Sequence, residues 1–86
     1  MTPCKQLNIG DRFKFNHMYF EKADLYQVNL QDGRTVMSNA KFLSDDHYES
    51  GKTDMWINGP SVHIADHIEV DPFNGQTRRE KVLAKS

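Results

Sequence analysis

Alternation of apolar and polar residues is the dominant pattern along this chain, and it predicts β-strands. In "LNIGDRFKF" the residues Leu7, Ile9, Phe13 and Phe15 fall on one side of an extended chain, with a turn at Gly10-Asp11. Apolar residues two apart with charged residues between them are typical of a half-buried strand. The next stretch, "HMYFEKA", fits two strand registers equally well.

The stretch "LYQVNLQDGRTVMS" predicts a β-hairpin. Apolar residues alternate toward Asp32-Gly33 and resume beyond it, and Asp-Gly suits a two-residue turn because both central residues need φ > 0. Such a turn places Leu30 opposite Thr35 and Val28 opposite Met37, which are favourable cross-strand pairs.

Residues 38–61 break the alternation and are rich in Ser, Asp, Gly and Asn. Ser38 or Asn39 could cap a short helix within 39–50 that stops at Gly51, because a side-chain oxygen there accepts an unpaired backbone N–H. A short strand through "MWI" is an alternative for the later part. Gly59-Pro60 predicts a turn.

The stretch "VHIADHIEV" predicts another strand, which Asp71-Pro72 ends because proline lacks an N–H for a ladder. Alternate positions form an inward face interrupted at Asp66, which indicates a bulge or a break near it. The apolar positions of this face are Val62, Ile64, Ile68 and Val70.

The same stretch carries two histidines four residues apart. In a strand, His63 and His67 lie about 13 Å apart and cannot share one metal ion. Only a helix, with His47 as a third ligand, would bring them together, and the β-branched residues argue against a helix. We expect solvent-facing histidines and no metal site.

After a turn at Asn74-Gly75, "TRRE" matches the capping-box pattern of Thr77 and Glu80. So few residues rarely hold a helix alone, so the segment is either a short helix or a frayed tail. The chain is thus expected to form one β-barrel domain over 1–75 with a basic tail over 76–86.

About five short strands around a small core predict an all-β, mainly antiparallel fold, a small and partly open SH3-like barrel. "LNIGDRFKF", "YFEK", the "LQDG" hairpin and "IEV" resemble the layout of small SH3-like barrel proteins of phage and prophage. The similarity covers roughly residues 7–37 and 62–73. It implies a fold and a phage origin, with Gly10-Asp11 opening the first strand, and implies no activity.

Charge and cysteine content narrow the function classes. The net charge of −1 is distributed as +2 over residues 1–44, −5 over 45–70 and +2 over 71–86. A nucleic-acid binder usually has a concentrated basic surface, and here only the tail is basic. Cys4, the single cysteine, excludes an internal disulfide. With no apolar leader or span, a cytoplasmic location away from membranes is expected.

The "SDDHYES" stretch is the main candidate for chemistry. Neighbouring carboxylates and a histidine can transfer protons or bind Ca²⁺, but the spacing is not that of a calcium loop. No nucleophile elbow is present, and Cys4 has no evident base. We therefore predict that this stretch is a solvated acidic loop. We also predict that the protein is not an enzyme and binds no cofactor. An enzyme would need a pocket joining His47 with His63 or His67.

The favoured function is a non-enzymatic interaction module that binds a protein partner with a basic surface, a host factor if the phage resemblance holds. Its loop 44–58 would supply aromatic anchors and steering charges. These residues are Asp45, Asp46, Tyr48, Glu49, Asp54 and Trp56. Trp56 could instead cap the barrel.

The alternative is a single-stranded nucleic-acid-binding barrel, in which aromatic residues stack bases and cations follow the backbone. Its cations would be Arg12, Lys14, Arg78 and Arg79. The oligomeric state stays open, since an uncovered strand edge could pair two copies.

Overall fold

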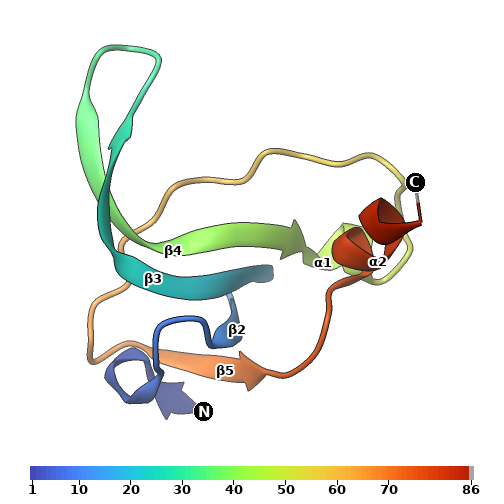
Figure 1. Ribbon diagram of the computed structural model, residues 1–86, viewed down its shortest axis with the longest axis horizontal. Helices are drawn as coiled ribbons and strands as arrows, with labels where there is room; N and C mark the ends of the chain where they lie inside the picture. The colour runs from blue at the N-terminus through green and yellow to red at the C-terminus, as the bar shows by residue number, and fades with distance from the viewer. Residues whose placement is uncertain (86) are drawn as a thin grey trace.

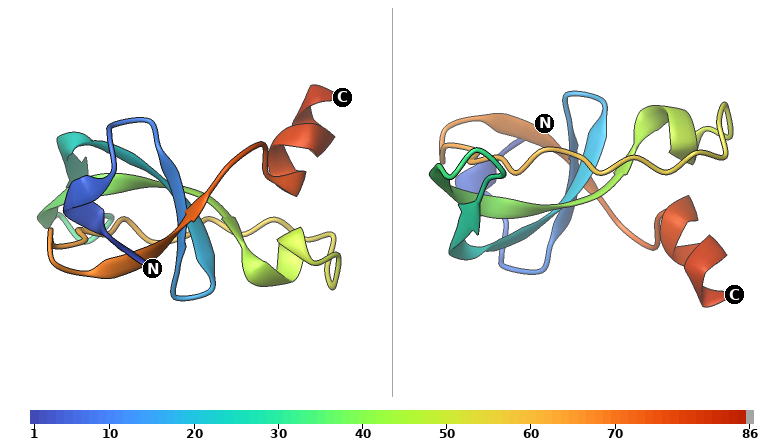
Figure 2. Two further views of the ribbon diagram at one scale, coloured as in Figure 1. Left: turned by 90° about the horizontal axis from the view of Figure 1, so that it is seen from below. Right: turned by 90° about the horizontal axis from the view of Figure 1, so that it is seen from above.

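The computed structural model describes residues 1–85, and its strands form one antiparallel sheet in the order β1-β5-β2-β3-β4 (Figure 1). Two short α-helices, α1 and α2, lie at one end of the molecule, beyond the strands (Figures 1 and 2). The elements in chain order are β1 (Thr2–Pro3), a 3-10 turn (Cys4–Gln6), β2 (Arg12–Phe15), β3 (Met18–Asn29), β4 (Thr35–Asp45), α1 (Asp46–Glu49), β5 (Glu69–Phe73) and α2 (Arg78–Ala84).

This architecture confirms the predicted small, mainly antiparallel β domain with short helices near residue 47 and at the C-terminus. The sheet is strongly bent and is not a closed barrel. Its edges within residues 1–85 are the two-residue β1 and the long β4. Beyond the bend, the end of β3 and the beginning of β4 form a two-stranded arm that projects away from the rest of the sheet (Figure 1).

The core lies inside the bend of the sheet and is small. Phe13 of β2 and Phe20 of β3 are fully buried and stack with ring centroids 5.7 Å apart. Phe42 of β4 packs edge-on against Phe20, with centroids 6.0 Å apart. The buried cluster consists of Cys4, Phe13, Phe20, Ala40, Ile64 and Val70. The predicted inward phenylalanines of the first strand thus do fill the core, with Phe15 packed at its margin.

A two-residue turn without glycine joins β2 to β3. Asn16 and His17 have φ of 52° and 63°, both in the left-handed region, which suits a tight hairpin. Glycine adopts this conformation without strain, asparagine with little strain, and histidine with more. The turn sets one register for β3, with Phe15 opposite Met18 and Phe13 opposite Phe20.

The hairpin at Asp32-Gly33 is present, but its predicted register was wrong by one residue. Asn29 pairs with Thr35, and Val28 pairs with Val36. The reason is that Gly33 (φ 88°) is the last residue of a three-residue loop, closed by Leu30 N–H donating to Arg34 O at 2.8 Å. Met37 is therefore turned outward and is 45% exposed.

The helix predicted within 39–50 is confined to Asp46–Glu49, because β4 continues to Asp45. Its cap is Asp45, whose carboxylate accepts from Tyr48 N–H at 2.7 Å, and neither Ser38 nor Asn39 serves as the cap. The strand is hidden in the sequence because two of its inward positions are serines. Ser38 and Ser44 are fully buried, and each hydroxyl donates a hydrogen bond, to Val62 O and to Glu49 respectively.

The strand predicted over 62–70 is mostly absent. Val62 makes one isolated bridge with Ala40, a turn follows at Ala65–Ile68, and β5 begins only at Glu69. The predicted inward face is nevertheless correct, since Ile64 and Val70 are buried while Val62 and Ile68 pack against the core.

Pro72 does not end this strand as predicted, because β5 runs to Phe73. Pro72 of β5 lies opposite Phe13 of β2. Proline is accommodated there because β1 pairs only with Glu69 and Val70, so within residues 1–85 no strand pairs with the other side of β5 at Pro72.

Replacing His17 by Gly is expected to stabilise the fold by about 0.5–1 kcal/mol, because relief of left-handed strain exceeds the added unfolded-state entropy of glycine. The urea midpoint should rise. Asn16→Gly is the matched control with a smaller gain, since asparagine tolerates φ > 0 better. An unchanged or lower midpoint for His17→Gly would contradict the assignment of strain to this turn.

Gly59→Ala is expected to destabilise the protein by about 1–3 kcal/mol, because a Cβ at this position would overlap ring atoms of Phe42. Urea unfolding measures the loss, and the exposed neighbour in Asn58→Ala serves as the control with little change. Equal stability of the two variants would show that Phe42 does not pack on Gly59.

Candidate functional site

The acidic, aromatic segment 44–58 and the basic tail lie against each other. α1 supplies Tyr48 and Glu49, and the extended chain that follows supplies Asp54 and Trp56. We call these four residues the arginine site, because they contact the guanidinium and backbone groups of Arg78 and Arg79 at the start of α2. The sequence analysis assigned the residues of segment 44–58 and the two arginines to separate candidate sites, and the structure brings them together.

Glu49 provides the backbone contacts of the arginine site. Its carboxylate accepts from Arg78 N–H at 2.6 Å and from Arg79 N–H at 3.2 Å, and it also accepts from the Ser44 hydroxyl at 2.6 Å. These N–H groups belong to the first turn of α2 and have no partner within the helix. A carboxylate from another element therefore satisfies them and complements the helix dipole.

Arg78 is held by both charge and an aromatic face. Its guanidinium lies 4.5 Å from the Tyr48 ring centroid, donates to Tyr48 O at 2.7 Å and forms an ion pair with Asp54 at 2.9 Å. Tyr48 is only 3% exposed. Tyr48 is thus a buried support for Arg78, and is not available as a contact anchor for another protein in this conformation.

Arg79 lies on the indole of Trp56. Its guanidinium carbon is 4.2 Å from the ring centroid, a favourable cation–π geometry. Trp56 is half-buried and also contacts the rings of Phe42 and Tyr48, with centroids 5.6 and 5.7 Å away. Arg79 Nε is buried without a hydrogen-bond partner among residues 1–85. Trp56 therefore packs against Phe42 at the margin of the core and also receives a cation.

A capping box and a second ion pair complete the attachment of α2. Thr77 is fully buried, its hydroxyl accepts from Glu80 N–H at 3.2 Å, and Glu80 accepts in return from Thr77 N–H at 3.1 Å. The sequence predicted this capping box correctly. Glu80 also forms a bidentate ion pair with Arg12 of β2, and Arg12 donates to Gly75 O at 3.0 Å.

The remaining predicted site residues have internal partners. Asp45 is 8% exposed and caps α1. Asp46 pairs with Lys14 at 3.1 Å, and this hydrogen bond lowers the pKa of the Asp46 carboxyl and raises that of Lys14. Of the four predicted cations, Arg12, Lys14 and Arg78 are thus paired with carboxylates, and Arg79 is stacked on Trp56.

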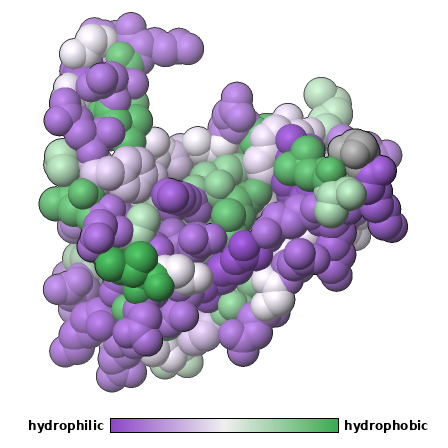
Figure 3. Space-filling view, in the orientation of Figure 1, coloured by the Kyte–Doolittle hydropathy of each residue, from purple (hydrophilic) through white to green (hydrophobic). Residues whose placement is uncertain are grey.

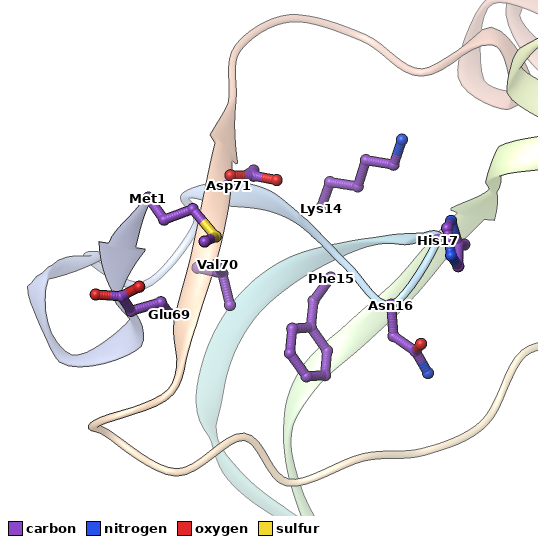
Figure 4. A pocket seen from close by; sticks show the side chains of 8 residues that line it. All are labelled: Met1, Lys14, Phe15, Asn16, His17, Glu69, Val70 and Asp71. Atoms are coloured by element: carbon purple, nitrogen blue, oxygen red, sulfur yellow. The ribbon is translucent and has the colours of Figure 1, made fainter.

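An open pocket of about 370 Å³ lies on another part of the molecule, between β2, β5, the 16–17 turn and the N-terminus (Figure 4). Its charged lining residues include Lys14, which already pairs with Asp46. His47, His63 and His67 do not line it, and all three are exposed. Within residues 1–85 no three His, Cys, Asp or Glu side chains are grouped as metal ligands are.

Comparison of this chain with protein-family models, with curated proteins and with solved structures gives no match. In the part of the chain that the structure describes, no helix has the length and apolar character needed to cross a membrane.

Glu80 should make the stability of the fold depend on pH. The hydrogen bond from Arg12 is the main reason that the pKa of Glu80 lies below its ordinary value of 4.5. A lowered folded-state pKa stabilises the protein above pH 4.5, and this contribution is lost as the pH falls through the folded pKa. We expect Glu80→Gln to cost about 1 kcal/mol at pH 7 and less below pH 4.5. Urea unfolding at both pH values measures this, and a pH-independent difference would refute the ion-pair contribution.

Proposed function

We propose that the protein is a non-enzymatic interaction module that binds a protein partner through segment 44–58. One observation carries the proposal: carboxylates and aromatic rings of this segment converge on two arginine side chains. Aromatic and charged side chains arranged around arginine are frequent at the energetic centres of protein interfaces. This arrangement supports binding of the segment to a basic protein surface.

The outer side of the segment offers a free contact surface. Met55 and Ile57, on either side of Trp56, are 76% and 50% exposed, and the Asp54 side chain is 93% exposed. Figure 3 shows hydrophobic atoms among hydrophilic ones at the end of the molecule that carries both helices. Exposed apolar side chains with an acidic neighbour fit an interface with an apolar centre and a polar rim.

Single-stranded nucleic-acid binding receives less support. A phosphate backbone is bound by lysine and arginine that release counterions, whereas Arg12, Lys14 and Arg78 already neutralise carboxylates of the same chain. Binding a nucleic acid would break these pairs and bring phosphates close to the carboxylates. Nucleic-acid binding is therefore kept as an outcome of the test below.

We further propose a cytoplasmic location, a setting that suits the buried, reduced Cys4. Burial also raises the pKa of this thiol, so it is less reactive than an exposed one. If the phage resemblance holds, the partner is a host protein. A bacterial lysate is then the appropriate source of partners.

The test is capture of proteins from a nuclease-treated bacterial lysate by the tagged chain. Changing both Met55 and Ile57 to Ser should reduce capture of the partner about tenfold or more, since interface centres lose at least this much. Both side chains are exposed, so the fold should be retained. Tyr48→Ala is unsuitable, because Tyr48 is buried.

The matched control changes Ile9 and Met37, which are also exposed but lie far from the segment in sequence, to Ser. The control should capture the partner as the unmodified chain does. Equal capture by both double variants would refute the assignment to segment 44–58. A species that is captured from an untreated lysate and is lost after nuclease treatment would instead establish nucleic-acid binding.

A further inference from the structure

We propose that α2 is an internal competitor for the arginine site, and that the protein partner carries an arginine pair that displaces it. This inference rests on the proposed function and specifies the chemistry of the partner. The four residues of the arginine site are at present occupied by a segment of the same chain, and that segment shows which groups the site selects.

Recognition is concentrated in the first turn of α2. With the arginine site it places two backbone N–H groups on Glu49, one guanidinium on Tyr48 and Asp54, and a second guanidinium on Trp56. Residues 81–85 are exposed. The site thus selects two adjacent arginines whose backbone N–H groups are free, as they are at the beginning of a helix. Lysine is not equivalent to either arginine here, because its ammonium group lacks the planar shape of the guanidinium.

The contacts that hold α2 allow it to detach from the arginine site. No residue of α2 itself is buried, and the connecting residues Asn74, Gly75 and Gln76 are exposed. A seven-residue helix is not stable alone in water, so its release amounts to local unfolding of the tail. Release leaves the strand pairing of the sheet in place, uncovers the Tyr48 and Trp56 rings and frees the Glu49 carboxylate, while the Asp54 side chain is already 93% exposed.

The covalent tether determines what a competitor must provide. A short flexible linker gives a tethered segment an effective concentration of the order of millimolar. A free segment with the same contacts therefore displaces α2 poorly, and a partner needs additional contacts. Met55 and Ile57 lie on the same stretch of chain as Trp56 and are exposed, so an arginine pair next to apolar side chains fits the combined surface.

The experiment measures binding of a fluorescein-labelled peptide with the sequence of residues 76–86 to the full chain by fluorescence anisotropy. In the variant Arg78→Ala/Arg79→Ala, the arginine site is retained while its internal occupant is weakened. We expect this variant to bind the peptide about tenfold or more tightly than the unmodified chain does. A peptide with both arginines replaced by lysine should bind more weakly.

The location of the bound peptide is tested by adding Asp54→Lys to the double variant. Asp54 is exposed, and its ion-pair partner within residues 1–85 is Arg78, so the fold should be unaffected and peptide affinity should fall. Unchanged affinity, or no peptide binding to a double variant with an intact circular dichroism spectrum, overturns the proposal.

If the double variant does not fold, Glu80→Ala replaces it. This variant keeps both arginines but lacks the capping box and the pair with Arg12, so it should bind the peptide more tightly than the unmodified chain, and equal affinity overturns the proposal. Failure here is distinguishable from failure of the proposed function, because partner capture and its dependence on Met55 and Ile57 are measured with α2 intact.

Discussion

The carboxylate of Glu49 is the interaction on which the arrangement of the helical end depends. It receives hydrogen bonds from Ser44 at the end of β4 and from the first two N–H groups of α2. One side chain of α1 thereby fixes the end of the sheet and the start of the C-terminal helix. Without it, two helix N–H groups and a buried serine hydroxyl would lose their partner, and unsatisfied buried polar groups are costly.

The sequence predicted the structure correctly at positions where the residue type by itself determines burial or helix capping. The inward positions Ile64 and Val70 and the Thr77–Glu80 capping box were predictable, because burial and capping act locally. The strand through Ser38 and Ser44 was not predictable, since a serine is buried only when distant groups accept its hydrogen bond. The hairpin register was missed because Gly33 suits either a two-residue or a three-residue loop.

The candidate site was predictable by residue type and not by arrangement. An acidic segment and a basic tail were both evident, and their opposite charges are the signal that could have indicated pairing within the chain. That pairing depends on tertiary distances, such as those that bring Arg78 to Asp54 and Arg12 to Glu80 across the fold. The resemblance to SH3-like phage proteins remains an expectation about origin.

A continuous row of aromatic ring contacts runs from the middle of the core to the arginine site. Its members, in order, are Phe13, Phe20, Phe42, Trp56 and Tyr48. Gly59 makes this row possible, because only a residue without a side chain leaves room for the Phe42 ring. Occupancy of the site and cohesion of the core are therefore thermodynamically linked. We expect any segment that fills the site, internal or external, also to slow amide exchange in the strands that carry these rings.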